Sequence, residues 1–244
     1  MKAMSFREGP DESARLTIRG LRGGYGDSQV LHGIDLQVRR GEVVTLLGRN
    51  GSGRTSTLRA IVGLLPRRTG SIRLGEVEAI GRPPEAIVRL GVGYCPEERG
   101  IFSRLSVREN LLLPPAINRA GLSVDDIFEM FPNLRERSDA GGARLSGGEQ
   151  QMLAIARILR TGVDLLLLDE PTEGLAPVIV AAIRRTIVEL KRRGFTILLV
   201  EQKLDFAGAV GDRHYLIEQG QVVDELDAAT LRTDTARVSA TLGL

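Results

Sequence analysis

A glycine-rich loop follows the apolar run at residues 43–47 and has the spacing of a phosphate-binding loop. Its glycines allow successive backbone N–H groups to turn toward a polyphosphate, and the N-terminus of a following helix adds its dipole. The Thr55 hydroxyl would coordinate Mg²⁺, with Ser56 behind it on the same turn. A purely structural turn between a strand and a helix is the alternative. The loop consists of Gly48, Arg49, Asn50, Gly51, Ser52, Gly53, Arg54, Thr55 and Ser56.

Two adjacent carboxylates, Asp169 and Glu170, follow the apolar run at residues 165–168. Such a run predicts a buried strand, and residues at the carboxyl end of a parallel strand meet the ligand crevice. We expect Asp169 to hold Mg²⁺, directly or through water, and Glu170 to activate the attacking water as general base. Two acids at a strand end could also begin a solvated loop, but the phosphate-binding loop favours the catalytic interpretation.

Arg54 stands where a phosphate-binding loop of this spacing carries lysine. A guanidinium keeps the positive charge and can pair with phosphate oxygens, but it is bulkier, planar and bidentate. It is therefore less suited to follow charge on the β- and γ-phosphates into the transition state. A misfit of about 1.4–4 kcal/mol would slow hydrolysis about tenfold to a thousandfold. A harmless replacement is the alternative, because this chain has 30 arginines and 3 lysines.

A second glycine-bearing helix start lies about twenty residues before the paired acids, at Ser146, Gly147, Gly148 and Glu149. Ser146 and Glu149 form a capping box, and a helix N-terminus of this kind can hold an anion. Alone, such a helix start has no particular function. Its position upstream of Asp169 and Glu170 makes the pattern a specific indication of function.

Together, the three segments resemble the nucleotide-binding subunit of ATP-binding-cassette (ABC) transporters. In that family, the segment at Ser146–Gly148 closes over the γ-phosphate held by the opposite subunit. The resemblance therefore implies ATP and Mg²⁺ as cofactors, ATP hydrolysis as the activity, and a dimer as the active unit.

The same resemblance implies roles for three more residues. Tyr25 would stack on adenine, although a tyrosine that only shapes a turn is a serious alternative. Glu97 stands where most cassettes have a glutamine that contacts Mg²⁺ and water, and Gln202 where most have a histidine that senses the γ-phosphate. Glutamine can still form a hydrogen bond to a phosphate oxygen, but it cannot shuttle a proton as imidazole does.

Within that family, the chain resembles the branched-chain amino-acid uptake ATPases of the LivF type, over about residues 15–225. The segments that carry this likeness are Tyr94–Phe102, Pro171–Pro177 and Val200–Gln202; Arg54 departs from it. The likeness implies import of branched-chain amino acids, or of related amino acids and amides. The partners would be a second ABC ATPase in a heterodimer or homodimer, two integral membrane permease subunits and, indirectly, an extracytoplasmic solute-binding protein. The chain would then be cytoplasmic and peripheral on the inner face of the cell membrane, with its segment from about Arg99 to Leu113 against the permease.

Strand patterns alternate with helix patterns along most of the chain, which predicts an α/β fold with a mostly parallel sheet. We expect a P-loop NTPase of the ABC nucleotide-binding type over residues 15–226, with an antiparallel β part near its start. A capping box at Ser106 and Glu109 and a further helix that Ser123 can cap indicate an inserted helical subdomain at about residues 84–160. Residues 1–14 would be an N-terminal extension, without the apolar core of a signal peptide, and residues 227–244 a short C-terminal tail.

Composition narrows the function further. A net charge of +2 gives no electrostatic case for nucleic acid, and the single cysteine, Cys95, cannot form an internal disulfide. ABC ATPases that act on nucleic acid or ribosomes carry tandem cassettes, a long coiled-coil insert or zinc-binding cysteine pairs, so that alternative is weaker. A hydrolysis-impaired, ATP-binding partner subunit remains an alternative because of Arg54.

Overall fold

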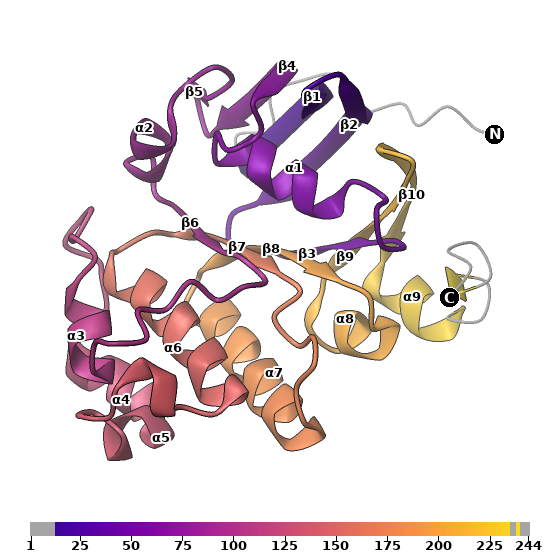
Figure 1. Ribbon diagram of the computed structural model, residues 1–244. Coiled ribbons are helices and arrows are strands. Elements are labelled where there is room, and N and C mark those ends of the chain that lie inside the picture. The colour runs from indigo at the N-terminus through magenta and orange to yellow at the C-terminus, as the bar shows by residue number, and fades with distance from the viewer. Residues whose placement is uncertain (1–12, 235–237, 240–244) are drawn as a thin grey trace.

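Two β-sheets form the frame of the molecule (Figure 1). The computed structural model describes residues 13–234 and 238–239. Within these residues the first sheet is antiparallel and has the strand order β2-β1-β4-β5. Its strands are β1 (Ala14–Tyr25), β2 (Ser28–Arg39), β4 (Arg67–Leu74) and β5 (Val77–Glu78).

The second sheet has the strand order β10-β9-β3-β8-β7-β6 in the described part of the chain. All neighbouring pairs in it are parallel except β9 and β10. The mostly parallel sheet and the antiparallel β part are therefore confirmed. The strands are β3 (Val43–Leu47), β6 (Val92–Cys95), β7 (Leu165–Asp169), β8 (Thr196–Glu201), β9 (Arg213–Glu218) and β10 (Gln221–Asp227).

Alternate side chains of the second sheet enter two different cores. In β3, Val44 and Leu46 pack between the two sheets, together with Leu58 and Ile61 of α1 (Arg54–Ile61). Val43 points to the opposite face, which α6 (Gly147–Arg160) and α7 (Pro177–Arg192) cover. Strands buried on both faces require continuous apolar runs, which explains the composition of residues 43–47 and 165–168.

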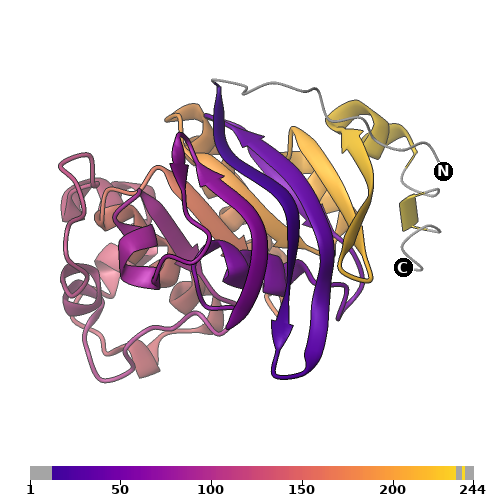
Figure 2. The same ribbon diagram turned by 90° about the horizontal axis from the view of Figure 1, so that it is seen from above.

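Short helices complete the molecule, and α3 to α5 gather at one side of it (Figure 2). The side chains of Ser106, Ser123 and Ser146 each accept a hydrogen bond from the backbone N–H three residues on, so these capped helix starts lie where the sequence predicts them. The short helices are α2 (Pro84–Val88), α3 (Val107–Leu112), α4 (Val124–Met130), α5 (Pro132–Glu136), η1 (Gly142–Arg144), α8 (Leu204–Val210) and α9 (Ala228–Thr233).

The predicted range of the helical subdomain, about 84–160, starts too early. Residues 92–95 form β6 inside the large sheet, and Ile87 of α2 belongs to the core between the two sheets. A strand of four residues that includes Gly93 is too short to produce a strand pattern. The predicted N-terminal extension lies outside the described residues except for residues 13 and 14, the latter already in β1. In the predicted tail, Leu231 of α9 packs in a small third core.

His214 lies on β9, between β10 and β3. It is fully buried, and its Nδ1 lies 2.7 Å from the Thr45 hydroxyl, while its Nε2 has no hydrogen-bond partner among the described residues. Burial lowers the pKa of His214 to about 4, although the nearby Asp212 and Asp227 carboxylates oppose this shift. The folded chain therefore binds its proton only at acidic pH, whereas the unfolded chain binds it below about pH 6.5.

We expect acid to destabilise the wild-type protein more than His214→Gln. Between about pH 6.5 and pH 4, His214 binds a proton in the unfolded state but not in the folded state, so the free energy of unfolding decreases as the pH falls. The wild type should lose up to about 3 kcal/mol more than the variant over this window. Urea unfolding of both proteins at several pH values measures the difference. Parallel pH dependences would contradict this account.

Candidate functional site

The phosphate-binding loop joins the end of β3 to the start of α1. A Cβ at Gly48 would lie 2.4 Å from the Ile217 carbonyl oxygen, and Gly53 adopts a left-handed φ of 106°, so both positions require glycine. No side chain caps α1, which leaves the N–H groups of its first turn available to an anion. The loop therefore has the geometry of a phosphate cradle.

Residues 50–56 of the loop and the predicted acid Glu170 line one cavity of about 370 Å³, whereas Asp169 does not line it but is hydrogen-bonded to Thr55 of the loop. The carboxyl ends of the parallel strands β3, β7 and β8 lie at the same edge of the sheet (Figure 1). The loop and the acids lie at or just after these strand ends and are therefore brought together at this edge. Glu170 and Gln202 follow β7 and β8, and the exposed Glu97 follows β6. The lining consists of Val30, residues 50–56, Glu97, Glu170, Glu173 and Gln202.

Asp169 lies beside the loop with the geometry of a metal ligand. It is 1% exposed, and its Oδ1 accepts a hydrogen bond of 3.0 Å from the Thr55 hydroxyl. Burial raises the pKa of Asp169, and hydrogen bonds from Tyr94 and Thr55 oppose the shift. The two oxygens suit Mg²⁺, which prefers one or two protein ligands together with phosphate oxygens and water. Within the described residues, no group of three or more His, Cys, Asp or Glu side chains could hold a metal ion.

Glu170 stands at the turn after β7 in a strained conformation. Its φ of 44° is left-handed, which is uncommon for a residue with a side chain and is often found at active sites. Its two carboxylate oxygens accept hydrogen bonds of 2.9 Å from different donors, Arg54 and Gln202. The group that would activate water is therefore held from two sides.

Arg54 does not lie free above the loop. Its guanidinium is 4% exposed and forms an ion pair with Glu170. It also donates to the Glu201 carbonyl oxygen at 2.8 Å and to Asn50 Oδ1 at 3.3 Å. Burial lowers the pKa of Arg54, while the charges of Glu170 and Asp169 oppose this effect, so the guanidinium stays charged. Gln202 also donates to Asn50 Oδ1, at 2.6 Å, so Arg54, Asn50, Glu170 and Gln202 form one hydrogen-bonded network.

Other predicted residues do not line this cavity. Tyr25 lies at the end of β1, 36% exposed, with its hydroxyl 3.5 Å from Nη1 of Arg59. Arg49 lines a neighbouring cavity formed with residues 217–219. Ser146, Gly147 and Gly148 lie at the start of α6, where a Cβ at Gly148 would meet the Ile179 side chain at 2.6 Å.

The structure also identifies partners that the motifs did not indicate. The Tyr94 hydroxyl donates to Asp169 Oδ2 at 3.0 Å, and the buried Glu201 carboxylate accepts the Thr172 hydroxyl at 3.0 Å. Burial raises the pKa of Glu201, and the hydrogen bond from Thr172 opposes the shift. Tyr94 stands three residues before Glu97, but only the pairing of β6 with β7 shows that it reaches Asp169.

Comparison with known proteins shows which family this sequence resembles. Residues 31–173 match the sequence profile of the ABC transporter family. The chain is 41% identical to BraG of Pseudomonas aeruginosa, a high-affinity branched-chain amino acid transport ATP-binding protein, over 90% of this chain and 95% of that protein. It is 36% identical to LptB of Escherichia coli K12, a lipopolysaccharide export system ATP-binding protein, over 86% of this chain and 89% of that protein.

The fold also resembles that of solved ATP-binding cassettes. A crystal structure of a nucleotide-free ATP-binding cassette from an ABC transporter superposes with a TM-score of 0.79 at 23% sequence identity. The superposition covers 95% of this chain and all of the other. At this identity the likeness establishes the arrangement of the sheets and helices, and the residues of the site must be judged by their own geometry.

Proposed function

Because this chain belongs to the ABC transporter family of ATP-binding ATPase subunits, we propose that it energises the import of branched-chain amino acids, or of related amino acids and amides. The likeness to BraG supports this class of solute. The likeness to LptB, an export protein, means that the solute itself has to be established by transport.

The observation that carries the ATPase role is the convergence of three separate segments on one cavity. The loop at residues 48–56 supplies backbone donors for ATP phosphates, and Thr55 with Asp169 would hold Mg²⁺. Bound Mg²⁺ would neutralise charge on the β- and γ-phosphates. Glu170 would accept a proton from the attacking water, and Gln202 would form a hydrogen bond to a γ-phosphate oxygen. Glu97, at the cavity wall, would contact Mg²⁺ and water.

A second ATPase subunit is needed to complete this site. None of Ser146, Gly147 and Gly148 lines the cavity of its own chain, and the Ser146 side chain is exposed at the start of α6. We therefore infer that these residues act on ATP held by a partner ATPase, whose equivalent segment covers the loop described here. Tyr25 would stack on adenine from the end of β1.

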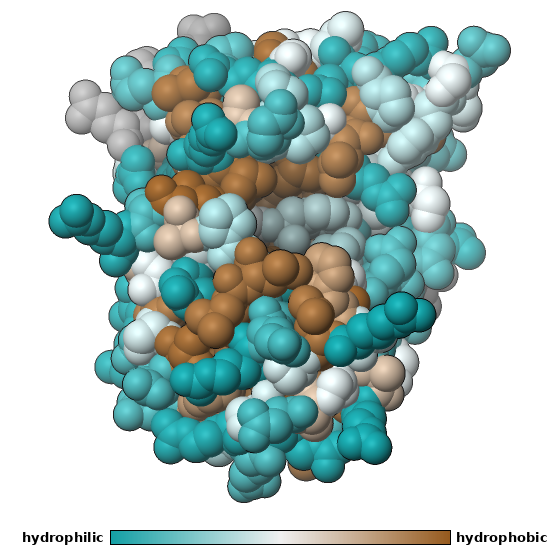
Figure 3. All heavy atoms as spheres, turned by 60° about the vertical axis from the view of Figure 1, so that its left-hand side comes forward, coloured by the Kyte–Doolittle hydropathy of each residue, from teal (hydrophilic) through white to brown (hydrophobic). Residues whose placement is uncertain are grey.

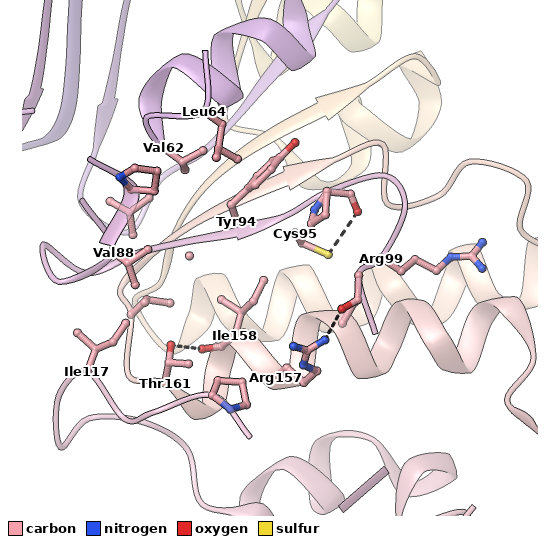
Figure 4. A pocket seen from close by; sticks show the side chains of 18 residues that line it. Val62, Leu64, Val88, Tyr94, Cys95, Arg99, Ile117, Arg157, Ile158 and Thr161 are labelled. Carbon is pink, nitrogen blue, oxygen red and sulfur yellow. Dashed lines mark hydrogen bonds between the residues drawn. The ribbon is translucent and has the colours of Figure 1, made fainter. Parts of the chain in front are cut away.

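A groove on another face fits a permease helix. It has a volume of about 360 Å³, and apolar side chains gather along both of its rims (Figure 3). Leu64 and Val88 lie on one side, with Ile158 and Ile117 opposite (Figure 4). Leu64 is 52% exposed and belongs to this contiguous apolar lining, and exposed apolar patches of this kind mark interaction sites.

The segment after β6 forms one end of this groove. Arg157 donates to the Gly100 carbonyl oxygen at 2.6 Å and stacks on the Phe102 ring at 4.8 Å, so it holds the segment in place. Among the described residues, no helix is long and apolar enough to cross a bilayer. We infer that permease subunits supply the membrane-spanning part and hold this chain on the inner face of the cell membrane, with a solute-binding protein acting from outside.

One observation favours a second candidate function. The ion pair between Arg54 and Glu170 engages the carboxylate that would act as general base. If ATP does not displace it, this chain would bind ATP and close the dimer while its partner performs the hydrolysis.

Solute uptake by the assembled transporter tests the proposed function. Proteoliposomes containing this chain, its partner ATPase and the permeases should accumulate labelled leucine when solute-binding protein and ATP are supplied. Leu64→Glu places a charge in the groove and should abolish uptake while the free subunit still binds ATP. Val223→Glu is the matched control, because Val223 is 45% exposed on β10. Uptake of another solute in place of amino acids or amides would contradict the assignment.

A further inference from the structure

Tyr94 connects the metal site with the groove. Its ring forms part of the groove wall, and its hydroxyl is directed away from Ile158 and Arg157 (Figure 4). That hydroxyl donates to Asp169 Oδ2 at 3.0 Å. No motif of the sequence assigns a role to this tyrosine.

The surrounding contacts hold the Tyr94 hydroxyl in one orientation. Tyr94 pairs with Leu167 of β7, two residues before Asp169, so the sheet itself brings the two residues together. The positive charge of Arg59 of α1 lies near the same hydroxyl, and because a guanidinium has only donors the phenol proton remains for Asp169. Arg59 in turn lies 3.7 Å from a carboxylate oxygen of Glu98, next to Glu97.

The two oxygens of Asp169 have different partners. Oδ1 accepts from Thr55 and Oδ2 from Tyr94. Thr55 is itself a proposed Mg²⁺ ligand, so its hydroxyl would turn its lone pairs to the metal and its proton elsewhere when Mg²⁺ is bound. The hydrogen bond from Tyr94 would not compete with the metal, because it engages Oδ2 and leaves Oδ1, the oxygen beside Thr55, for Mg²⁺. Groups that orient a metal ligand in this way commonly change metal affinity about 10- to 100-fold when they are removed.

We propose that Tyr94 is a positioning residue for Asp169, which fixes the carboxylate in the orientation that Mg²⁺ requires. This inference rests on the proposed role of Asp169 as a metal ligand. Tyr94 does not line the cavity proposed for the nucleotide, so its contribution would act through the Asp169 carboxylate.

Binding of ADP with and without Mg²⁺ tests the inference without any turnover. Tyr94→Phe keeps the ring in the groove wall and removes only the hydroxyl. The affinity for ADP in EDTA should be unchanged, whereas the gain in affinity on adding Mg²⁺ should fall about tenfold. Titration calorimetry of the full chain measures both values, and unchanged binding in EDTA also shows that the variant is folded.

Two further variants separate positioning from a general loss of structure. In an Asp169→Asn background, Tyr94→Phe should have no further effect on the gain from Mg²⁺, because the residue it positions is altered. Tyr215→Phe removes a buried hydroxyl that contacts Arg213 on β9, a strand separated from β7 and Asp169 by β3 and β8, and should leave the gain from Mg²⁺ unchanged.

The possible outcomes are distinct. If Tyr94→Phe retains the full gain from Mg²⁺ within about twofold, well below the 10-fold expected, Tyr94 is a wall residue and the inference is wrong. An equal loss in EDTA and in Mg²⁺ would also overturn it, because the hydroxyl would then stabilise the loop in general. If the wild type itself gains nothing from Mg²⁺, the proposed role of Asp169 fails instead.

Discussion

Replacing Arg54 by lysine should raise MgATP turnover at this chain's own phosphate-binding loop by between about tenfold and a thousandfold. The guanidinium spreads its donors over Glu170, Asn50 and the Glu201 carbonyl oxygen, and each of these contacts must be disturbed before it can follow the γ-phosphate. An ammonium concentrates its charge on one nitrogen at the end of a flexible stem. Lysine should therefore release Glu170 and reach the phosphates.

The measurement needs a dimer in which only this loop is active. The loop lysine of the partner ATPase is disabled in both samples, and turnover by wild type and Arg54→Lys is compared at saturating MgATP. A ratio within about threefold, which is below 1.4 kcal/mol, would show that Arg54 is a harmless replacement. Turnover that appears only with lysine would support the second candidate function, in which this chain binds ATP and its partner hydrolyses it.

Glu170→Gln should lower turnover at this loop by about 10²- to 10⁴-fold, the usual contribution of a general base. The amide preserves the shape of the side chain and can still accept a hydrogen bond from Arg54, but it cannot take a proton from water. ATP should therefore remain bound without being cleaved. Single-turnover assays with labelled ATP, again with the partner loop disabled, measure hydrolysis and retention together.

The size of this effect should depend on residue 54. In the wild type, Arg54 already restrains Glu170, so the loss on Glu170→Gln should be smaller than in an Arg54→Lys background. Glu76→Gln, at an exposed position in the turn between β4 and β5, is the matched control and should leave both backgrounds unchanged. Equal losses in the two backgrounds would show that the ion pair has no effect on the general base.

The motifs predicted which strand ends would meet, because parallel strands bring their carboxyl ends to one edge of a sheet. Glu170 and Gln202 do line one cavity with the loop, although residues 48–56 precede Gln202 by roughly 150 positions. The helix starts at Ser106, Ser123 and Ser146 were also predictable, since a capping box depends on four consecutive residues. Patterns of this local kind do not require knowledge of the tertiary structure.

Other features of the structure could not be predicted from local sequence patterns. The predicted helical subdomain wrongly included β6, because four residues with a central glycine show no clear alternation of apolar and polar residues. Likewise, the sequence placed Tyr25 and the segment at residues 146–148 in the nucleotide site through family resemblance. The structure leaves the segment away from its own loop, which is why a partner subunit enters the proposal.

By itself, the sequence determined the chemistry available to this protein: a phosphate-binding loop, a paired acid after a buried strand, and a second glycine-bearing helix start. Each depends on neighbouring residues, whose spacing along the chain fixes their geometry. Only the tertiary structure decided how these groups act on one another. Arg54 meets Glu170 across 116 positions, and Tyr94 meets Asp169 across 75. The first contact arises because α1 starts beside the end of β7, and the second from the pairing of β6 with β7; no local pattern encodes either arrangement.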